Sequence, residues 1–210
     1  MAGTAMKVDL KRQLGELYRA HAEPALVEVP SMRFLMIDGH GDPNGSTTFR
    51  EAVQSLYAVS YGLKFRVRGM DHGIEYGVMP LEGLWWIPNA RVWDFEDKSD
   101  WDWTLMIMQP DVVTEELVDE ILAEKADVHD TVAIERLRFE TFAEGTVAQA
   151  LHVGPWAAER ATLERLSEFV RTAGYLPTGK HHEIYLSDPA RTAPERLRTI
   201  VRHPVYRREA

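Results

Sequence analysis

The segment Arg33-Phe-Leu-Met-Ile-Asp-Gly-His-Gly-Asp-Pro43 decides the expected fold, because an apolar strand leads into a Gly/Pro loop that precedes a helix. The segment Thr146-Val-Ala-Gln-Ala-Leu-His-Val-Gly-Pro155 repeats this order in the second half. In each half we expect a hairpin before the loop, and a helix and two strands after it. The repeat predicts an α+β fold of two pseudo-symmetric strand–helix–strand–strand units. Their mainly antiparallel sheet would carry two long helices on one face, with a ligand groove between the halves.

We expect one domain over residues 1–210, with a first half at 8–110, a linking helix at 111–136 and a second half at 137–205. The chain is 210 residues long, which suits one large domain.

Local signals place the elements within the halves. Apolar residues at helical spacing predict a helix over Leu10–His21, and Thr48 with Glu51 fits a capping box at the start of the next helix. Hairpins are expected at 25–38 and 137–153. The stretch Glu82–Asp100, rich in Trp, Pro and Asp, reads as an irregular loop.

The charge balance restricts the partners. Lys and Arg number 24 and Asp and Glu 33, so the formal net charge is −9, which argues against a nucleic-acid or anionic-membrane partner. The chain contains no Cys, which excludes disulfides and thiolate chemistry. Because neither a signal core nor an apolar run of about 20 residues is present, we expect a cytoplasmic protein. A monomer and a homodimer both remain open.

The stretch His181-His-Glu-Ile-Tyr-Leu186 carries the clearest chemical signal. On a strand, alternate side chains share a face, so His181, Glu183 and Tyr185 point one way and His182, Ile184 and Leu186 the other. If the first face is an aromatic-lined cleft, burial should raise the pKa of Glu183 and suit it to act as a general base. The alternative is a wet sheet face on which Glu183 pairs with a Lys.

A metal site in the same region is disfavoured. His181, His182 and His152 could bind a metal ion together with Glu183, but adjacent histidines on a strand diverge, and no metal-binding motif is present. We therefore expect neither a metal nor another cofactor.

Aromatic residues are numerous, with six Trp and seven Tyr, and eight Met accompany them. They could form a cage for a planar or cationic organic ligand, or they could be ordinary core residues. The expected ligand-binding residues are Tyr57, Tyr76, Trp85, Trp86, Trp101, Trp103, Met108, Trp156 and His181.

Several motifs together resemble a known family. The chain is similar to the GyrI-like small-molecule-binding proteins, closest to their stand-alone branch, in the segments Phe34-Leu-Met-Ile-Asp-Gly-His-Gly-Asp-Pro43, Leu81-Glu-Gly-Leu-Trp-Trp86, Trp101-Asp-Trp-Thr-Leu-Met-Ile-Met-Gln-Pro110 and Gly179-Lys-His-His-Glu-Ile-Tyr-Leu-Ser-Asp-Pro189. The resemblance covers about Val8 to Val205. It implies two strand–helix–strand–strand units and an aromatic pocket with one buried acidic residue, which here is Glu183.

The resemblance also implies a function. Some members of the stand-alone branch are cyclopropanoid hydrolases, which add water to the strained ring of DNA-alkylating compounds and so detoxify them. Carried onto this chain, Glu183 would activate the water, and Tyr185 or Tyr61 would hydrogen-bond the substrate carbonyl as it becomes a phenolate. The alternative is a non-catalytic binder or sensor of hydrophobic or cationic aromatic drugs, such as the effector-sensing component of a transcription regulator. Either way, the expected partner is a planar aromatic or cationic small molecule.

Overall fold

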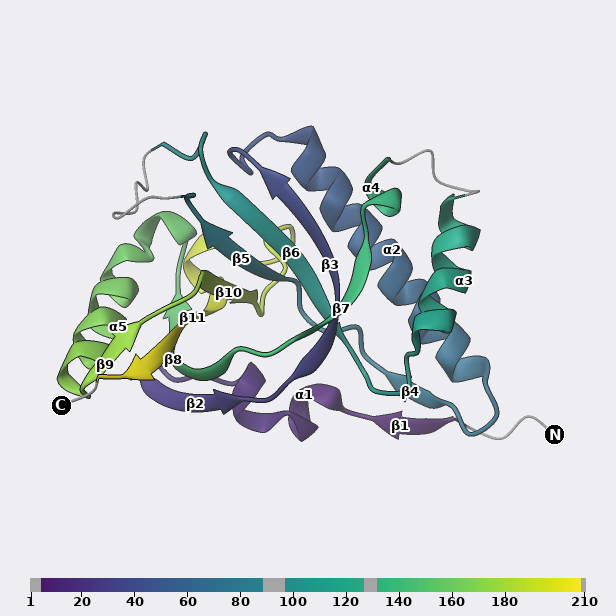
Figure 1. Ribbon diagram of the computed structural model, residues 1–210, viewed down its shortest axis with the longest axis horizontal. Coiled ribbons are helices and arrows are strands. Elements are labelled where there is room, and N and C mark those ends of the chain that lie inside the picture. The colour runs from purple at the N-terminus through teal and green to yellow at the C-terminus, as the bar shows by residue number, and fades with distance from the viewer. Residues whose placement is uncertain (1–4, 89–96, 127–131, 209–210) are drawn as a thin grey trace. The chain divides into compact units, whose positions relative to one another are not determined.

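The computed structural model describes residues 5–88, 97–126 and 132–208 (Figure 1). The chain divides into two compact units, which are described separately. Unit 1 comprises Met1–Gln13, Met32–Met79 and Ile87–Phe142. Unit 2 comprises Leu14–Ser31, Pro80–Trp86 and Ala143–Ala210.

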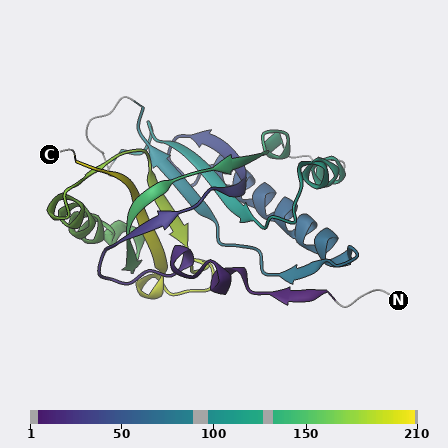
Figure 2. The ribbon, with the colours of Figure 1, turned by 60° about the horizontal axis from the view of Figure 1, so that its bottom comes forward.

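Unit 1 combines helices with antiparallel strands in the order β7-β3-β6, and a separate parallel pair, β1 and β4. Its elements are β1 (Met6–Val8), α1 (Leu10–Gln13), β3 (Met32–His40), α2 (Thr47–Gly69), β4 (Ile74–Tyr76), β6 (Asp102–Gln109), α3 (Glu115–Ala126), α4 (Val132–Glu135) and β7 (Arg138–Phe142). Helix α2 packs on β3 and β6, and Figures 1 and 2 agree in showing α3 alongside it. An ion pair from Arg66 to Glu120, 2.7 Å long, joins these two helices.

Unit 2 contains antiparallel strands in the order β2-β8-β11-β10-β5, and β9 pairs with the far end of β11. Its elements are the 3-10 helix η1 (Gly15–Tyr18), β2 (Ala25–Val29), β5 (Glu82–Trp86), β8 (Gly145–Val153), the 3-10 helix η2 (Trp156–Ala158), α5 (Arg160–Thr172), β9 (Tyr175–Pro177), β10 (His181–Tyr185), the 3-10 helix η3 (Pro194–Arg196) and β11 (Arg198–Arg207). The expected α+β class with mainly antiparallel pairing is confirmed.

The two expected hairpins are wrong. Strand β2 pairs with β8, whereas β3 pairs with β6 and β7, so neither hairpin forms. The first strand of each expected hairpin, β2 or β7, pairs with a strand from the other half of the sequence. The orders β7-β3-β6 and β2-β8-β11 match each other, so the repeat is preserved. Alternating apolar residues identify a strand and its buried face, but they do not identify its partner.

Three local expectations also change. The stretch expected as one helix at Leu10–His21 is split into α1 and η1, because Gly15 adopts a positive φ of 43° that a helix cannot continue through. Helix α2 starts earlier than Thr48, because the side chain of Ser46 accepts a 3.1 Å hydrogen bond from the Phe49 amide. The first part of the expected loop at Glu82–Asp100 is strand β5, and residues 89–96 lie outside the described residues.

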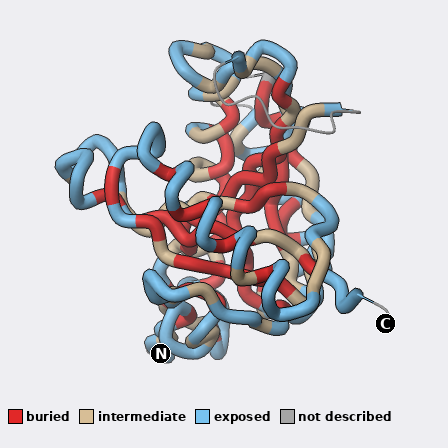
Figure 3. Tube along the Cα trace, turned by 90° about the vertical axis from the view of Figure 1, so that its left-hand side faces the viewer, coloured by how far each residue is buried: buried red, intermediate tan, exposed pale blue. Residues whose placement is uncertain are grey.

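The core of each unit lies between strands and one long helix. In unit 2, Leu163, Leu166 and Val170 of α5 pack on alternate residues of β8 and β11. Figure 3 shows the resulting pattern along the chain, with mostly buried central strands and helices that alternate between buried and exposed residues. None of the helices in the described part of the chain has the combined length and apolarity needed to cross a bilayer.

Candidate functional site

Strand β10 positions the expected base. His182 pairs with Arg202 of β11 and Leu84 of β5, so the side chains of His181, Glu183 and Tyr185 share the opposite face, as the sequence predicts. Glu183 lies opposite Gly83 on β5 and Val201 on β11. Because Val201 belongs to the core cluster with α5, Glu183 faces the side of the unit 2 sheet that α5 covers.

Glu183 is withdrawn from solvent. Its side chain is only 12% exposed, so the alternative of a wet sheet face is wrong. Its Oε1 atom lies 3.0 Å from Nε2 of His181, which is itself buried. The carboxylate therefore has a histidine partner within its own strand, where the sequence alternative proposed a Lys.

Two tryptophan side chains contact Tyr185. The indole N–H of Trp85 donates a 3.1 Å hydrogen bond to it, and the Trp156 ring meets the phenol ring edge-on at 5.7 Å. Burial, followed by the negative charge of Glu183 and a hydrogen bond to it, raises the pKa of Tyr185 well above its usual value. The phenol therefore stays protonated and can act as a hydrogen-bond donor.

A glycine makes room for this arrangement. A Cβ atom at Gly83 would lie 2.7 Å from Nε1 of Trp85 and 3.2 Å from the Tyr185 hydroxyl. The missing side chain opposite Glu183 thus provides the space in which the indole and the phenol meet. Trp86, the next residue of β5, belongs by strand alternation to the opposite face, where Nζ of Lys180 lies 3.2 Å from its ring centroid in a close cation–π contact.

A second carboxylate lies near Glu183. Glu159, the residue before α5, is buried, and one ligand atom from each of Glu159, His181 and Glu183 lies within 4.8 Å of the others. These three residues have the donor types that a divalent transition ion accepts. His182 and His152 do not join them. His152 is 3.0 Å from the Thr162 hydroxyl and 3.1 Å from the Pro155 carbonyl instead.

The opposite face of β10 carries buried charged residues beside the buried Ile184. His182 lies between two carboxylates, with Nε2 2.9 Å from Glu82 and Nδ1 3.0 Å from Glu144. Arg202 lies 3.6 Å from Glu144 and donates a 2.8 Å hydrogen bond to Gln149. All five of these side chains are buried or nearly so, and the two carboxylates balance the two cations.

Electrostatics keeps this buried network ionised. Burial alone would lower the pKa of His182, but the charges of Glu144 and Glu82 and their hydrogen bonds raise it to about 9. Burial alone would raise the pKa of Glu144, but His182 and Arg202 outweigh it and lower that pKa. The network lies on the face of β10 opposite Glu183 and stabilises the position of the strand that carries this residue.

The other predicted site residues belong to unit 1. Trp103 is fully buried against Phe49, with ring centroids 5.2 Å apart, and Tyr61 is exposed on α2. The remaining predicted residues are Tyr57, whose ring lies tilted beside that of Tyr61 with centroids 6.4 Å apart, and the buried Tyr76, Trp101 and Met108. Participation of these six residues in a ligand site stays a prediction, as does the groove between the halves.

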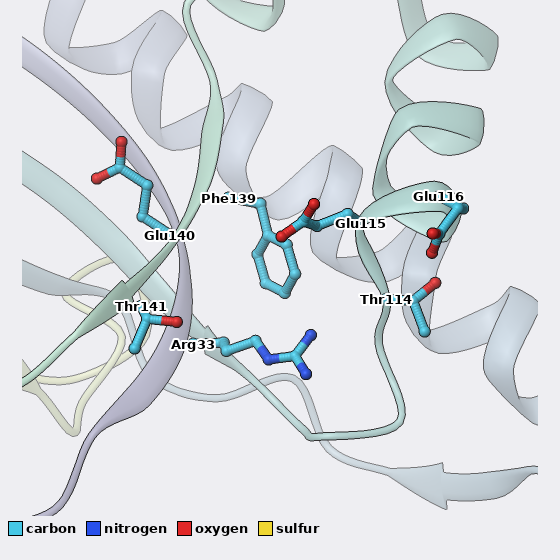
Figure 4. Close-up of a pocket in the computed structure, with 7 residues that line it drawn as sticks. All are labelled: Arg33, Thr114, Glu115, Glu116, Phe139, Glu140 and Thr141. Atoms are coloured by element: carbon cyan, nitrogen blue, oxygen red, sulfur yellow. The ribbon is translucent and has the colours of Figure 1, made fainter.

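Unit 1 also contains a polar surface hollow of about 420 Å³, shown in Figure 4. It is lined by Arg33, Thr114, Glu115, Glu116, Phe139, Glu140 and Thr141. The Arg33 guanidinium lies 5.7 Å from the ring centroid of Phe139 and donates a 3.0 Å hydrogen bond to the Val113 carbonyl. Its cation is thus already engaged, and the lining includes none of the predicted site residues.

Sequence reasoning missed two residues of the unit 2 site, Glu159 and His203. His203 reaches His181 because β11 pairs with β10, and Glu159 reaches Glu183 because α5 begins above that face. The strand partner of β10 could not be predicted, so neither contact was visible. The only signal for Glu159 was its place shortly after the Gly154-Pro155 loop.

Comparison with known proteins agrees with this architecture. The model of the GyrI-like small molecule binding domain matches residues 22–205. A conserved, uncharacterised protein from Listeria innocua is 39% identical, with a TM-score of 0.88 over 95% of this chain and 100% of its own. Two crystal structures of proteins described as hydrolases from Listeria innocua are each 38% identical, with TM-scores of 0.81 and 0.84 over the same shares.

No curated protein matches the chain. The family match spans most of the sequence, and the Listeria innocua structures match nearly all of it at close to 40% identity. Strand β10 with Glu183, and the side chains of Trp85 and Trp156 that contact Tyr185, lie within the matched region. The chain therefore belongs to the GyrI-like small-molecule-binding family.

Proposed function

We propose that this protein hydrolyses electrophilic cyclopropanoid compounds of the DNA-alkylating type and thereby detoxifies them. The observation that carries the proposal is the withdrawn carboxylate of Glu183 beside the Tyr185 hydroxyl, Trp85 and Trp156. Planar aromatic substrates bind well against such rings, and a carboxylate shielded from solvent is a stronger base than one in water. The family match and the hydrolase descriptions of the Listeria innocua proteins support the same reading.

Glu183 takes a proton from a water molecule in the proposed reaction. The water oxygen forms a bond to the cyclopropane CH₂ while a ring C–C bond breaks, and the released electron pair converts the conjugated carbonyl into a phenolate. Glu183 then releases its proton to solvent and becomes ionised again, and the phenolate takes up one proton from solvent. Ring strain supplies much of the driving force, so one positioned base, worth about 10²–10⁴-fold, is sufficient.

Tyr185 is the proposed hydrogen-bond donor to the substrate oxygen. Its raised pKa keeps the phenol protonated, and Trp85 holds its oxygen in place with a 3.1 Å hydrogen bond. A protonated phenol stabilises the developing phenolate more than it stabilises the ground-state carbonyl. Tyr61, the other tyrosine considered for this role, is exposed on α2 in unit 1.

The test is turnover of a spirocyclopropane drug, followed by the loss of its dienone absorbance in the ultraviolet. The Glu183→Gln variant should lose about 10²-fold or more in kcat, since the amide cannot accept the proton. The matched control is Glu164→Gln, which changes an exposed carboxylate of α5. Equal rates for Glu183→Gln and the wild type would refute the general-base role.

A non-catalytic binder or drug sensor is the second candidate. The carboxylates of Glu159 and Glu183 lie close together beside the Trp156 ring and the Tyr185 phenol. Carboxylates attract a cation by charge, and aromatic rings attract it by cation–π contact. This function predicts tight binding of a planar cation, measured by quenching of tryptophan fluorescence, with the ligand recovered unchanged. A cytoplasmic location and a single domain over residues 1–210 are part of both proposals.

A further inference from the structure

Glu183 is the end of a hydrogen-bonded chain that continues through two histidines. Its Oε1 atom lies 3.0 Å from Nε2 of His181, and Nδ1 of His181 lies 2.9 Å from Nε2 of His203 on β11. Both are ordinary hydrogen-bond distances. The two imidazole rings stand at 88° to each other with centroids 5.1 Å apart. The ring of buried His181 is therefore held at both nitrogens, and its partner His203 is half-buried.

We infer that His181 is a positioning residue for Glu183, and that His203 fixes its ring. His181 donates its Nε2 proton to Oε1 of Glu183 and so holds the carboxylate in the orientation in which it accepts the proton of the attacking water. His203 holds the imidazole in the orientation that this donation requires. The inference rests on the proposed function, since it assigns these roles in the reaction of Glu183.

The hydrogen bonds constrain where the protons of the two histidines lie. When Nδ1 of His181 carries no proton, it accepts a hydrogen bond from Nε2–H of His203, and when it carries one, Nε2 of His203 is the acceptor. Burial, followed by the charge that His181 can acquire, lowers the pKa of His203 to about 3. His203 is therefore a neutral imidazole at physiological pH, and its tautomer sets that of His181.

Other titratable groups face the same carboxylate. Tyr185 lies on the same strand, and Glu159 approaches from the start of α5. Glu144, in the turn before β8, acts on His203 and raises its pKa against the other two effects. Tyr185 also hydrogen-bonds Glu183, so the carboxylate has a polar contact besides the chain through His181.

The first experiment measures kcat against pH for a spirocyclopropane drug. Removal of the donor in His181→Phe should lower kcat about tenfold or more and move the acid limb of the profile to higher pH, because ionised Glu183 loses a stabilising hydrogen bond. His181→Gln, whose amide N–H still reaches toward Glu183, should restore part of both effects. His203→Phe should give a smaller change in the same direction, and His203→Gln should restore it.

The control is His21→Gln, which alters an exposed histidine of unit 2 and should leave the profile unchanged. A merely structural role would lower the rate at every pH without moving the acid limb. A wild-type profile in His181→Phe, or a uniform loss of rate in a variant with a native circular dichroism spectrum, would overturn the inference.

A second measurement does not need turnover. In ¹⁵N-labelled protein, Glu183→Gln should shift the imidazole nitrogen signals of His181 and, through the shared hydrogen bond, those of His203. If the wild type hydrolyses nothing while these shifts occur, the proposed function fails and the chain stands as a feature of a ligand-binding site. Unmoved signals of both histidines would overturn the chain itself, whether or not the protein is a hydrolase.

Discussion

His182 and Glu82 form a buried ion pair, with Nε2 2.9 Å from Oε2 and side chains at most 1% exposed. They lie on neighbouring strands, β10 and β5, although 100 residues separate them along the chain. His181, the preceding residue, contacts Glu183 on the other face. Two adjacent histidines thus lie on opposite faces of one strand, and His182 belongs to a network of paired, buried charges on its face.

The network makes the stability of the protein depend on pH. The pKa of His182 is raised to about 9 from 6.5, so its contribution is fully present below pH 6.5 and is lost as the pH rises through 9. The lowered pKa of Glu144 gives a contribution that is present above its unfolded value of 4.5 and is lost as the pH falls through the folded value. Urea unfolding at several pH values should therefore show the largest network contribution between pH 4.5 and 6.5.

The variant His182→Gln tests the origin of this dependence. The decline in unfolding free energy between pH 6.5 and 9 should flatten, because the titrating imidazole is absent. An unchanged slope would assign the decline to another group.

Removal of Arg202 should be strongly destabilising. Arg202→Met leaves Glu144 with one cation instead of two and removes the donor to Gln149. Loss of one member of a buried ionic network typically costs about 3–5 kcal/mol, because the remaining charge is uncompensated. The comparison is Arg198→Met, at an exposed position of the same strand, which should change the unfolding free energy by less than about 0.5 kcal/mol. Similar losses in the two variants would contradict a role for the network.

The sequence predicts on which face of a strand a side chain lies better than it predicts which strands pair with each other. Alternation in the stretch 181–186 correctly separates Glu183 from His182, because the side-chain period of a strand is a local property. The exchange of β2 and β7 between the halves and the contact of His181 with His203 depend on strand pairing, which is not local. The charged face behind β10 was unpredictable for the same reason, because its four ionised members come from three strands and the turn before β8.

Gly83 should be intolerant of a side chain for functional reasons. The methyl group of Gly83→Ala would displace the Trp85 indole and break its hydrogen bond to Tyr185, because Cβ would lie 2.7 Å from Nε1. We expect a lower kcat/KM for a spirocyclopropane drug, and quenching of tryptophan fluorescence should report weaker binding. Gly77→Ala, at a position with nothing within 4 Å of the new Cβ, is the matched control. Wild-type kinetics in Gly83→Ala would show that the Trp85–Tyr185 contact is dispensable.

Zinc should inhibit the proposed reaction. Ligand atoms of Glu159, His181 and Glu183 lie within 4.8 Å of one another, so a bound Zn²⁺ would occupy the carboxylate that must accept the proton. We expect added Zn²⁺ to lower the initial rate and EDTA to restore it. EDTA treatment of the purified protein should leave turnover unchanged. Loss of turnover in EDTA, recovered with a metal ion, would instead show that the reaction uses the metal.

Trp156 should affect ligand binding more than stability. Its ring contacts Tyr185 edge-on at 5.7 Å while 44% of the residue remains exposed, so a planar ligand can reach it, and its removal leaves no buried cavity. Trp156→Ala should weaken binding of a planar aromatic ligand about tenfold, since a lost aromatic contact costs on the order of 1 kcal/mol. Phe65→Ala, which removes a similarly exposed ring from α2, controls for nonspecific adsorption to surface aromatics. Calorimetric titration gives both affinities, and equal losses in the two variants would mean that the ring of Trp156 is only one exposed aromatic among others.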